Sequence, residues 1–223
     1  MRGFEPRDAA MVAELDDEER TVLARIVADV GLLLGGERFG LEGEGEPEPI
    51  DSERALFAAL QGLEEALAEP DDPAILRLLP NASPEDREVA DEFRRLTEAD
   101  LRGLKVDRLR RMWRQLSEDG EQWRVERVEA DATAAALTDV RLVLATRLGL
   151  STDLEVDALH AEIDLAVRTL DEDEDATGVD HERVWLGMLY EALTWLQESL
   201  VRCLMDGDEP DAARSQDLGE DDV

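Results

Sequence analysis

Apolar and polar positions near the start of the chain follow two different periods. In AMVAEL (10–15) the two kinds of residue alternate, which predicts a short strand. Asp16 follows, with Glu19 three residues later, a pairing typical of a helix N-cap. Apolar residues then recur at helical spacing up to Gly35 and Gly36, where we expect the helix to end. The apolar positions on its inner side are Val22, Leu23, Ile26, Val27, Val30, Leu33 and Leu34.

The rest of the chain repeats the helical spacing in segments separated by Gly, Pro or acidic residues. Two breaks within residues 83–116 are marked by a cap-like pair, Thr97 with Asp100, and by Gly103. In the first half of the chain, further helices are expected over 53–68 after the cap Ser52, over 74–79, from Ser83 and Pro84 onward, and over about 105–116. In the second half, helices are expected from Asp131 to Leu148 before Gly149, from Thr152 onward, and over about 180–205. The helix that begins at Thr152 is expected to point Leu159, Ile163 and Val167 inward.

These segments predict the fold class and the domain organisation. WRVERVE (123–129) reads as a second strand, and we expect it to pair with the first, because an isolated strand leaves its backbone unsatisfied. The fold is therefore expected to be mainly α, a bundle of about six to eight helices with a small β element from two short strands. We expect one domain over 1–205, with a flexible Gly/Glu/Pro loop at 36–51 and an acidic linker at 171–179. The segment 206–223 is expected to be a disordered acidic tail.

The last expected helix is the most apolar, and its apolar side chains cover more than half of its circumference. A helix of this kind is either buried centrally or shared with a partner, so a homodimer is one expectation. The residues concerned are Trp185, Met188, Leu189, Ala192, Leu193, Trp195, Leu196, Leu200 and Leu204.

Composition and charge indicate the cellular compartment and exclude some classes of partner. The 223 residues include 57 acidic and 24 basic ones, a formal net charge of −33, and Lys105 is the sole lysine. Such a field repels nucleic acid and anionic lipid, so we expect neither as a partner. A lone cysteine, Cys203, fits a reducing compartment and is expected to be an inert buried thiol. With no signal peptide and no apolar run of membrane-spanning length, we expect a cytoplasmic protein that does not bind membranes.

Motifs that carry chemistry are missing from the sequence. His160 and His181 have no Cys or second His at metal-ligand spacing. GLEGEG (40–45) lacks the lysine of a phosphate-binding loop and carries glutamates that would repel phosphate. We therefore assign no catalytic, metal or cofactor-binding residue, expect no cofactor and do not expect an enzyme. An enzyme that uses carboxylates unmarked by any motif is the alternative.

A basic stretch stands out in this acidic chain. Eight basic residues fall within 94–116, and RLRRMWRQ (108–115) is its densest part. On a helical projection the apolar residues, with Trp113 among them, share one face, and Arg110, Arg111 and Arg114 point the opposite way. The basic residues are Arg94, Arg95, Arg102, Lys105, Arg108, Arg110, Arg111 and Arg114.

Three interpretations of this stretch remain open. It is a solvated face neutralised by the chain's own acids, a docking face for another protein through Arg108, Arg110, Arg111 and Arg114, or a contact to DNA. We favour the first and place DNA last, because the surrounding charge is negative and the tryptophan faces inward, where no base can stack on it.

Four stretches together resemble a known family. They are DPAILRLLPNA (72–82), EFRRLTEADLRGLK (92–105), LATRLG (144–149) and LTWLQESLVRCL (193–204). The chain is similar over about residues 1–205 to an actinobacterial family named domain of unknown function two-thousand-seventeen. The resemblance implies a gene neighbourhood that holds the Clp protease adaptor and a small metalloprotease of the deubiquitinase-like type. Some members carry the label of transcriptional regulator, and the resemblance implies no catalytic residue.

Two of these stretches place charged residues beside apolar anchors. Arg94 and Arg95 lie in FRRLTE, and Gln197 and Glu198 lie in LTWLQESL. Because an unpaired buried charge is costly, we expect structural polar contacts between them, for example Arg95 with Glu198. As function we expect a non-enzymatic protein-interaction or regulatory module, an accessory to Clp-type regulated proteolysis. A transcriptional regulator that contacts DNA through the 94–114 arginines is the alternative.

Overall fold

The computed structural model describes residues 1–36, 72–80, 86–118, 120–172 and 180–206. Within them lie six α-helices and one three-stranded sheet, which confirms a mainly α fold with a small β element. In chain order the elements are β1 (Arg2–Arg7), β2 (Ala10–Glu14), α1 (Asp17–Leu33), α3 (Pro73–Leu78), α4 (Arg87–Ser117), β3 (Gln122–Glu126), a 3₁₀ turn (Arg127–Glu129), α5 (Ala130–Leu148), α6 (Asp153–Glu172) and α7 (His181–Asp206).

The sheet is antiparallel, with strand order β1-β2-β3. The expected pairing of the two short strands is confirmed, because Met11 of β2 lies opposite Val125 of β3. The second strand ends at Glu126, earlier than expected, and the chain turns away at Val128, which is 90% exposed. The edge strand β1 was missed. Its sequence RGFEPR contains Gly3 and Pro6, both of which disfavour a strand, and an edge position tolerates proline.

Contacts with α7 explain why β1 forms. The backbone N–H of Phe4 donates to Ser199 Oγ at 2.8 Å, and Cys203 Sγ lies 3.2 Å from the Phe4 carbonyl oxygen. The Phe4 and Trp123 rings pack edge to face, with their centroids 5.0 Å apart. A Cβ on Gly3 would lie 2.9 Å from Ser199 Cβ, so glycine allows the close approach. Cys203 is buried, as expected, and burial raises the pKa of its thiol.

Helix α1 begins as the sequence predicts. Asp16 accepts from the Glu19 backbone N–H at 2.8 Å, and Glu19 accepts in return from the Asp16 N–H at 3.0 Å. This capping box satisfies two backbone donors at the helix start. The buried Arg20 donates from Nη2 to the carbonyl oxygens of Gln115 and Glu118, at 3.1 and 2.6 Å. The first turn of α1 therefore caps the carboxyl end of α4.

The expected breaks between residues 97 and 105 are wrong, because α4 is a single helix over Arg87–Ser117. Thr97 donates its hydroxyl to the Phe93 carbonyl at 2.8 Å, which is the bond of a threonine inside a helix. Glu98 pairs with Arg94 at 3.2 Å and with Arg102 at 2.6 Å. These successive i,i+4 pairs span the stretch that reads as a cap and stabilise the helix through it.

Several other predictions fall on residues that the structure does not describe, or have different bounds in the structure. Asp86 is the N-cap of α4, and the expected cap at Ser83 and Pro84 lies outside the described residues. So do the expected helix over 53–68, the expected loop over 36–51 beyond residue 36, and the expected tail over 206–223 beyond Asp206, which is the last residue of α7. The acidic linker was expected from residue 171, but α6 continues through Glu172, and 173–179 is not described. The sequence pattern placed the start of the linker too early, because acidic residues can continue a helix as well as form a linker.

Helices α5 and α6 meet at a tight turn. Helix α5 begins one residue before the expected Asp131 and ends at Gly149, whose φ of 72° is a left-handed conformation that glycine adopts freely. Glu155 accepts from the backbone N–H groups of Ser151 and Thr152, so α6 starts where Thr152 predicts. In α6, Leu159 and Ile163 are buried, but Val167 is 45% exposed, so its predicted inward position is wrong.

One side of α7 is buried and the other is not. Leu189, Leu193, Leu196 and Leu200 pack into the core. Trp185, Met188 and Trp195 are each 45–49% exposed. Neighbouring helices therefore account for part of the apolar circumference, and the homodimer stays a prediction. None of the helices in the described ranges combines the length and the apolar character that a membrane crossing requires.

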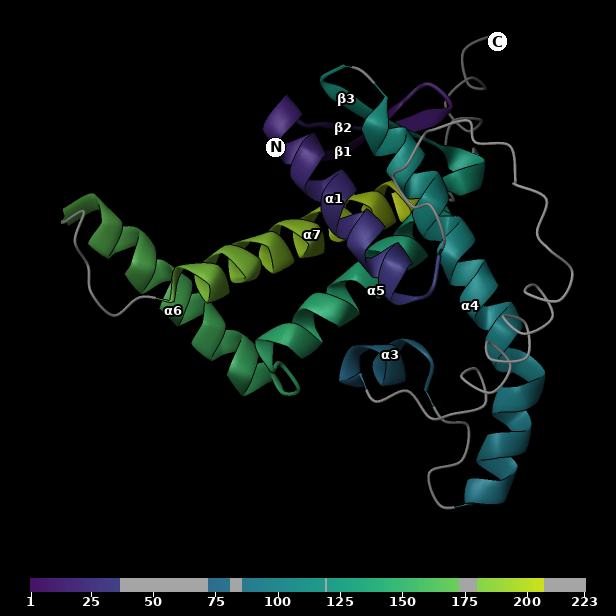
Figure 1. Ribbon diagram of the computed structural model, residues 1–223. Helices are drawn as coiled ribbons and strands as arrows, with labels where there is room; N and C mark the ends of the chain where they lie inside the picture. The colour runs from purple at the N-terminus through teal and green to yellow at the C-terminus, as the bar shows by residue number, and fades with distance from the viewer. Residues whose placement is uncertain (37–71, 81–85, 119, 173–179, 207–223) are drawn as a thin grey trace, which may run out of the picture.

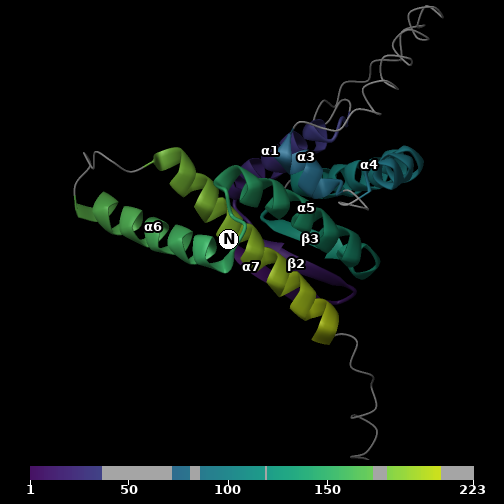
Figure 2. The same cartoon turned by 90° about the horizontal axis from the view of Figure 1, so that it is seen from below.

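Figure 1 shows α4 along one side of the molecule and α6 on the other, with α1, α5 and α7 between them. The N-terminal end of α4 lies farthest from the sheet. Seen from below, α7 runs beside the sheet at its C-terminal half and beside α6 at its N-terminal half (Figure 2). A main core joins the sheet to α1, α3, α4, α5 and α7, and a smaller cluster fills the α5–α6–α7 corner.

Candidate functional site

The C-terminal half of α4 has the amphipathic arrangement that the sequence predicts. Val106, Leu109, Met112 and Leu116 are buried, and Trp113 packs partly buried against the same core. The tryptophan therefore faces inward. The basic side chains occupy the remaining circumference and differ widely in their surroundings.

Six of the eight basic residues pair with carboxylates of this chain. Arg94 and Arg102 share Glu98, Arg95 pairs with Glu92, and Lys105 pairs with Asp139. Arg110 lies 3.0 Å from Asp107, and Arg111 lies 3.7 Å from Glu129. In the described part of the chain, Arg108 and Arg114 make no ion pair. The internal neutralisation that we favour thus applies to Arg110 and Arg111 among the four predicted docking residues.

The pair of Lys105 with Asp139 joins α4 to α5 inside the protein. The side chains are 14% and 4% exposed. Burial raises the pKa of the Asp139 carboxyl, although Lys105 and, more weakly, Arg108 act in the opposite direction. Among the described residues, the second carboxyl oxygen, Oδ2, has no hydrogen-bond partner. This is the most strongly desolvated carboxylate that the basic stretch contacts, and no sequence pattern marked it.

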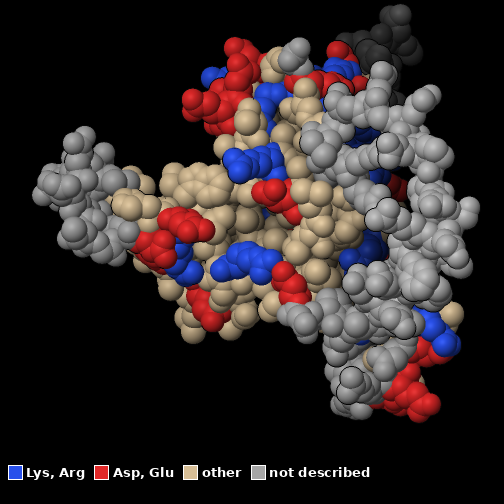
Figure 3. Space-filling view, viewed as in Figure 1, with Lys and Arg blue, Asp and Glu red and all other residues tan. Residues whose placement is uncertain are grey.

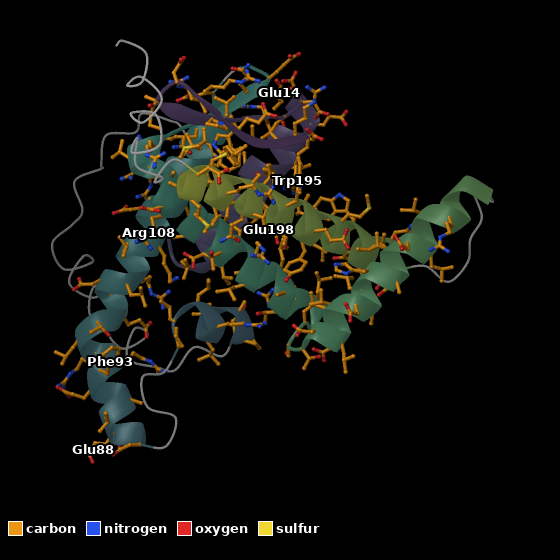
Figure 4. All side chains as sticks on the ribbon, turned by 180° about the vertical axis from the view of Figure 1, so that it is seen from behind. Glu14, Glu88, Phe93, Arg108, Trp195 and Glu198 are labelled. Carbon is orange, nitrogen blue, oxygen red and sulfur yellow. The ribbon has the colours of Figure 1, made fainter. Side chains whose placement is uncertain are left out.

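The proposed contact between Arg95 and Glu198 is wrong. Arg95 is 59% exposed and pairs with Glu92 on its own helix, and Glu198 is exposed on α7. Figure 4 shows Phe93, two residues before Arg95, far along α4 from Glu198. The prediction failed because it assumed that both stretches face a common interior, whereas the N-terminal half of α4 extends away from α7.

Gln197 does make a structural polar contact, but with α5. Its Nε2 donates to the Ala134 carbonyl oxygen at 3.1 Å and to Thr138 Oγ1 at 2.6 Å. Its Oε1 accepts from Arg141 Nη1 at 2.6 Å, and Arg141 Nε donates to Thr194 at 2.9 Å. The network links α5 to α7 where both carry apolar residues. Arg141 was missed because it lies outside the basic stretch.

The side of α4 that points away from the core carries an apolar stripe. Val89, Phe93, Leu96 and Leu104 are 54%, 49%, 66% and 47% exposed. At 100° per residue they fall within about 80° of one another, opposite Leu109, Met112 and Leu116. Arg111 and Arg114 continue the same stripe toward the sheet. We name the surface formed by Val89, Phe93, Leu96, Leu104, Arg111 and Arg114 the outer face of α4.

A hollow of about 490 Å³ lies at the N-terminal end of this face. Val89, Phe93 and Leu96 form its apolar lining, and Glu88 and Glu92 stand at its edge. Figure 4 shows Glu88 and Phe93 on this end of the helix, with Arg108 toward the sheet. The outer face thus has an apolar end edged by acids and a basic end, and the exposed Asp100 and Asp107 lie on the same side of the helix between them.

Metal chemistry has no support in the described ranges, since they contain no group of three or more His, Cys, Asp or Glu side chains placed to hold an ion. His160 lies 3.3 Å from Glu191 on α7 and does not pair with Asp164.

The comparison with protein families shows which family the chain belongs to. One family model, a domain of unknown function, matches residues 1–204. The chain belongs to DUF2017. The match confirms the resemblance and covers nearly the range that the sequence predicts. In this DUF2017 chain the four resembling stretches lie on α3, α4, α5 and α7. No curated protein and no solved structure matches it.

Proposed function

We propose that this chain is a cytoplasmic protein-interaction module, without catalytic activity of its own, that docks a helix of another protein on the outer face of α4. The observation that carries the proposal is the line of four half-exposed apolar side chains that leads into Arg111 and Arg114. Exposed apolar residues that gather on one side of a helix, with charged residues among them and at their edge, are typical of a surface that binds a partner.

The outer face defines the chemistry of the partner. From Val89 to Arg114 it runs over about 37 Å at 1.5 Å per residue, the length of a helix of about seven turns. The partner is an amphipathic helix whose apolar stripe covers Val89, Phe93 and Leu96. Its acidic residues would lie against Arg111 and Arg114, and its basic residues near Glu88 and Glu92.

The more specific form of the proposal places this docking in Clp-type regulated proteolysis. Its support is the gene neighbourhood that the family resemblance implies. The DNA alternative has less support, because six of the eight basic residues of the 94–114 stretch pair with carboxylates of the chain itself. An enzyme has less support too, since Asp139, the buried carboxylate with a raised pKa, does not line the hollow at the N-terminal end of α4.

The test compares capture of partners by wild type with capture by two variants of the outer face. Phe93→Asp/Leu96→Asp removes the apolar end, and Arg111→Glu/Arg114→Glu reverses the basic end. Leu154→Asp/Leu165→Asp is the matched control, because both leucines are exposed on α6, at 79% and 59%. Circular dichroism verifies that every variant is folded.

We expect a protein that wild type and the α6 control retain and that both outer-face variants lose. Identification of that protein as a component of Clp-type proteolysis supports the more specific form. Equal retention by all variants contradicts the outer face as the docking site. Salt-sensitive retention of DNA that the Arg111→Glu/Arg114→Glu variant abolishes would favour the transcriptional regulator instead.

A further inference from the structure

A second surface, separate from the outer face of α4, lies where α3, α5, α6 and α7 meet. A pocket of about 220 Å³ opens there, with Arg77 of α3, Arg141 of α5 and Tyr190 of α7 among its lining residues. Leu150 and Val156 supply apolar lining, and Asp153 lies at the start of α6. In size it falls below the roughly 300–1,000 Å³ of sites for drug-sized ligands, so it suits a smaller molecule.

Both arginines are held by neutral groups. Arg77 Nη1 donates to the Leu150 carbonyl oxygen at 2.9 Å. Arg141 donates to Thr194 and Gln197 and lies over the Tyr190 ring, with its guanidinium carbon 5.4 Å from the ring centroid. Neither arginine pairs with a carboxylate within the described ranges, although acidic residues outnumber basic ones 57 to 24 in the sequence.

Two arginines near Arg77 and Arg141 do form ion pairs with carboxylates, unlike Arg77 and Arg141 themselves. Arg147, six residues after Arg141 on α5, pairs with Asp72 at 2.7 Å. Arg183 of α7 pairs with Glu162 at 2.9 Å. On the face shown in Figure 3, acidic and basic side chains lie side by side in the middle, among uncharged ones. The pocket therefore carries two arginines that make no ion pair within the described ranges, against one carboxylate, Asp153, in its lining.

Two backbone donors at the start of α6 are already engaged. Glu155 already accepts from the backbone N–H groups of Ser151 and Thr152, at 2.6 and 2.8 Å. These bonds hold the pKa of the Glu155 carboxyl below its ordinary value. An anion in the pocket would therefore be bound by the guanidinium groups, whose planar forks suit carboxylate and phosphate oxygens.

From this geometry we propose that the pocket binds a small organic anion, a carboxylate or phosphate group carried on a short apolar body. The anionic group lies between Arg77 and Arg141, and the apolar body lies against Leu150 and Val156. The binding site goes beyond the proposed docking function, because it shares no residue with the outer face of α4.

Tyr190 provides a direct readout, because the sequence contains a single tyrosine. Protein labelled with 3-fluorotyrosine gives one fluorine NMR signal, and that signal reports on the pocket. The probes are butyrate, butyl phosphate and the neutral butyramide, each titrated at constant pH and ionic strength. We expect a saturable shift with butyrate or butyl phosphate, and none with butyramide.

Variants separate this site from general attraction of anions. Arg77→Gln and Arg141→Gln are expected to weaken binding about tenfold or more, the scale of one lost charge-assisted hydrogen bond. Arg147→Gln, which makes the same change of charge on α5 outside the pocket, is expected to leave affinity unchanged. Arg77 is exposed, so its variant should fold even if Arg141→Gln does not.

Three results would overturn the proposal. The first is the absence of a saturable shift with either anion. The second is an equal shift with butyramide, which would show that the apolar body alone binds. The third is an equal loss of affinity in Arg147→Gln, which would show that the arginines act only through the general field.

Discussion

Buried polar side chains join helices that are distant in the sequence. Lys105 with Asp139 links α4 to α5, Arg20 of α1 caps the end of α4, and Gln197 links α7 to α5. Each contact depends on a partner that sequence spacing does not reveal. The sequence placed Arg110, Arg111 and Arg114 outward, but it could not show that Asp107 and Glu129 lie beside the first two.

Asp139 offers a test of such a contact. Asp139→Ala leaves the Lys105 ammonium largely buried without its carboxylate, and we expect the free energy of unfolding to fall by about 3 kcal/mol. Urea denaturation at pH 7 measures the change. The double variant Lys105→Met/Asp139→Leu, which removes both charges, should recover much of the loss. A single variant as stable as wild type would contradict a structural role for the pair.

The contribution of Asp139 to the free energy of unfolding should change with pH in a definite direction. Burial raises the pKa of Asp139 above its ordinary value, so the folded state binds this proton more tightly than the unfolded chain does. The contribution of Asp139 to stability is therefore largest below the unfolded pKa and falls as pH rises through the folded pKa. Asp139→Asn does not titrate, so its stability relative to wild type should rise with pH from about 4 upward. Urea denaturation at successive pH values measures this difference, and a flat difference would contradict it.

At the scale of elements, the sequence predicted best those helices and strands that residues close in the chain determine. β2, α1 and the end of α5 follow from alternation, a capping box and a left-handed glycine, which act within a few residues. β1 could not be predicted, because it owes its form to pairing with β2 and to contacts of Phe4 with α7. The sequence marked Arg111 and Arg114 as candidate docking residues, and their docking role stays a prediction. Phe93 and Leu96 were not marked, because a helical pattern does not show which side of the helix a neighbouring element leaves exposed.

Gly103 tests the continuity of α4. It lies inside the helix and is exposed, and an added Cβ would meet nothing within 4 Å. Because alanine favours a helix over glycine, Gly103→Ala should raise the free energy of unfolding by about 0.5–1 kcal/mol. Gly149→Ala is the matched control and should lower it, because its φ of 72° strains any residue with a Cβ. Destabilisation by Gly103→Ala would indicate a break at this position.

At the scale of the whole molecule, the net charge of −33 opposes folding through self-repulsion. Raising NaCl from about 0.01 to 0.1 M shortens the Debye length from about 30 to about 10 Å and weakens that repulsion. We expect the melting temperature to rise over this range, since the surface ion pairs that salt also weakens contribute little individually. KCl should act like NaCl. A melting temperature that falls with either salt would mean that ion pairs outweigh repulsion.

The position of Lys105 has a consequence for the reactivity of the folded chain. The sequence contains one ε-amino group, and the fold holds it against Asp139 between α4 and α5, with 14% of the lysine side chain exposed. An acylating reagent must reach the amine nitrogen, and the packing of the two helices restricts that access. Acylation of Lys105, followed by mass spectrometry, would therefore measure how often that interface opens, without any label introduced by mutation.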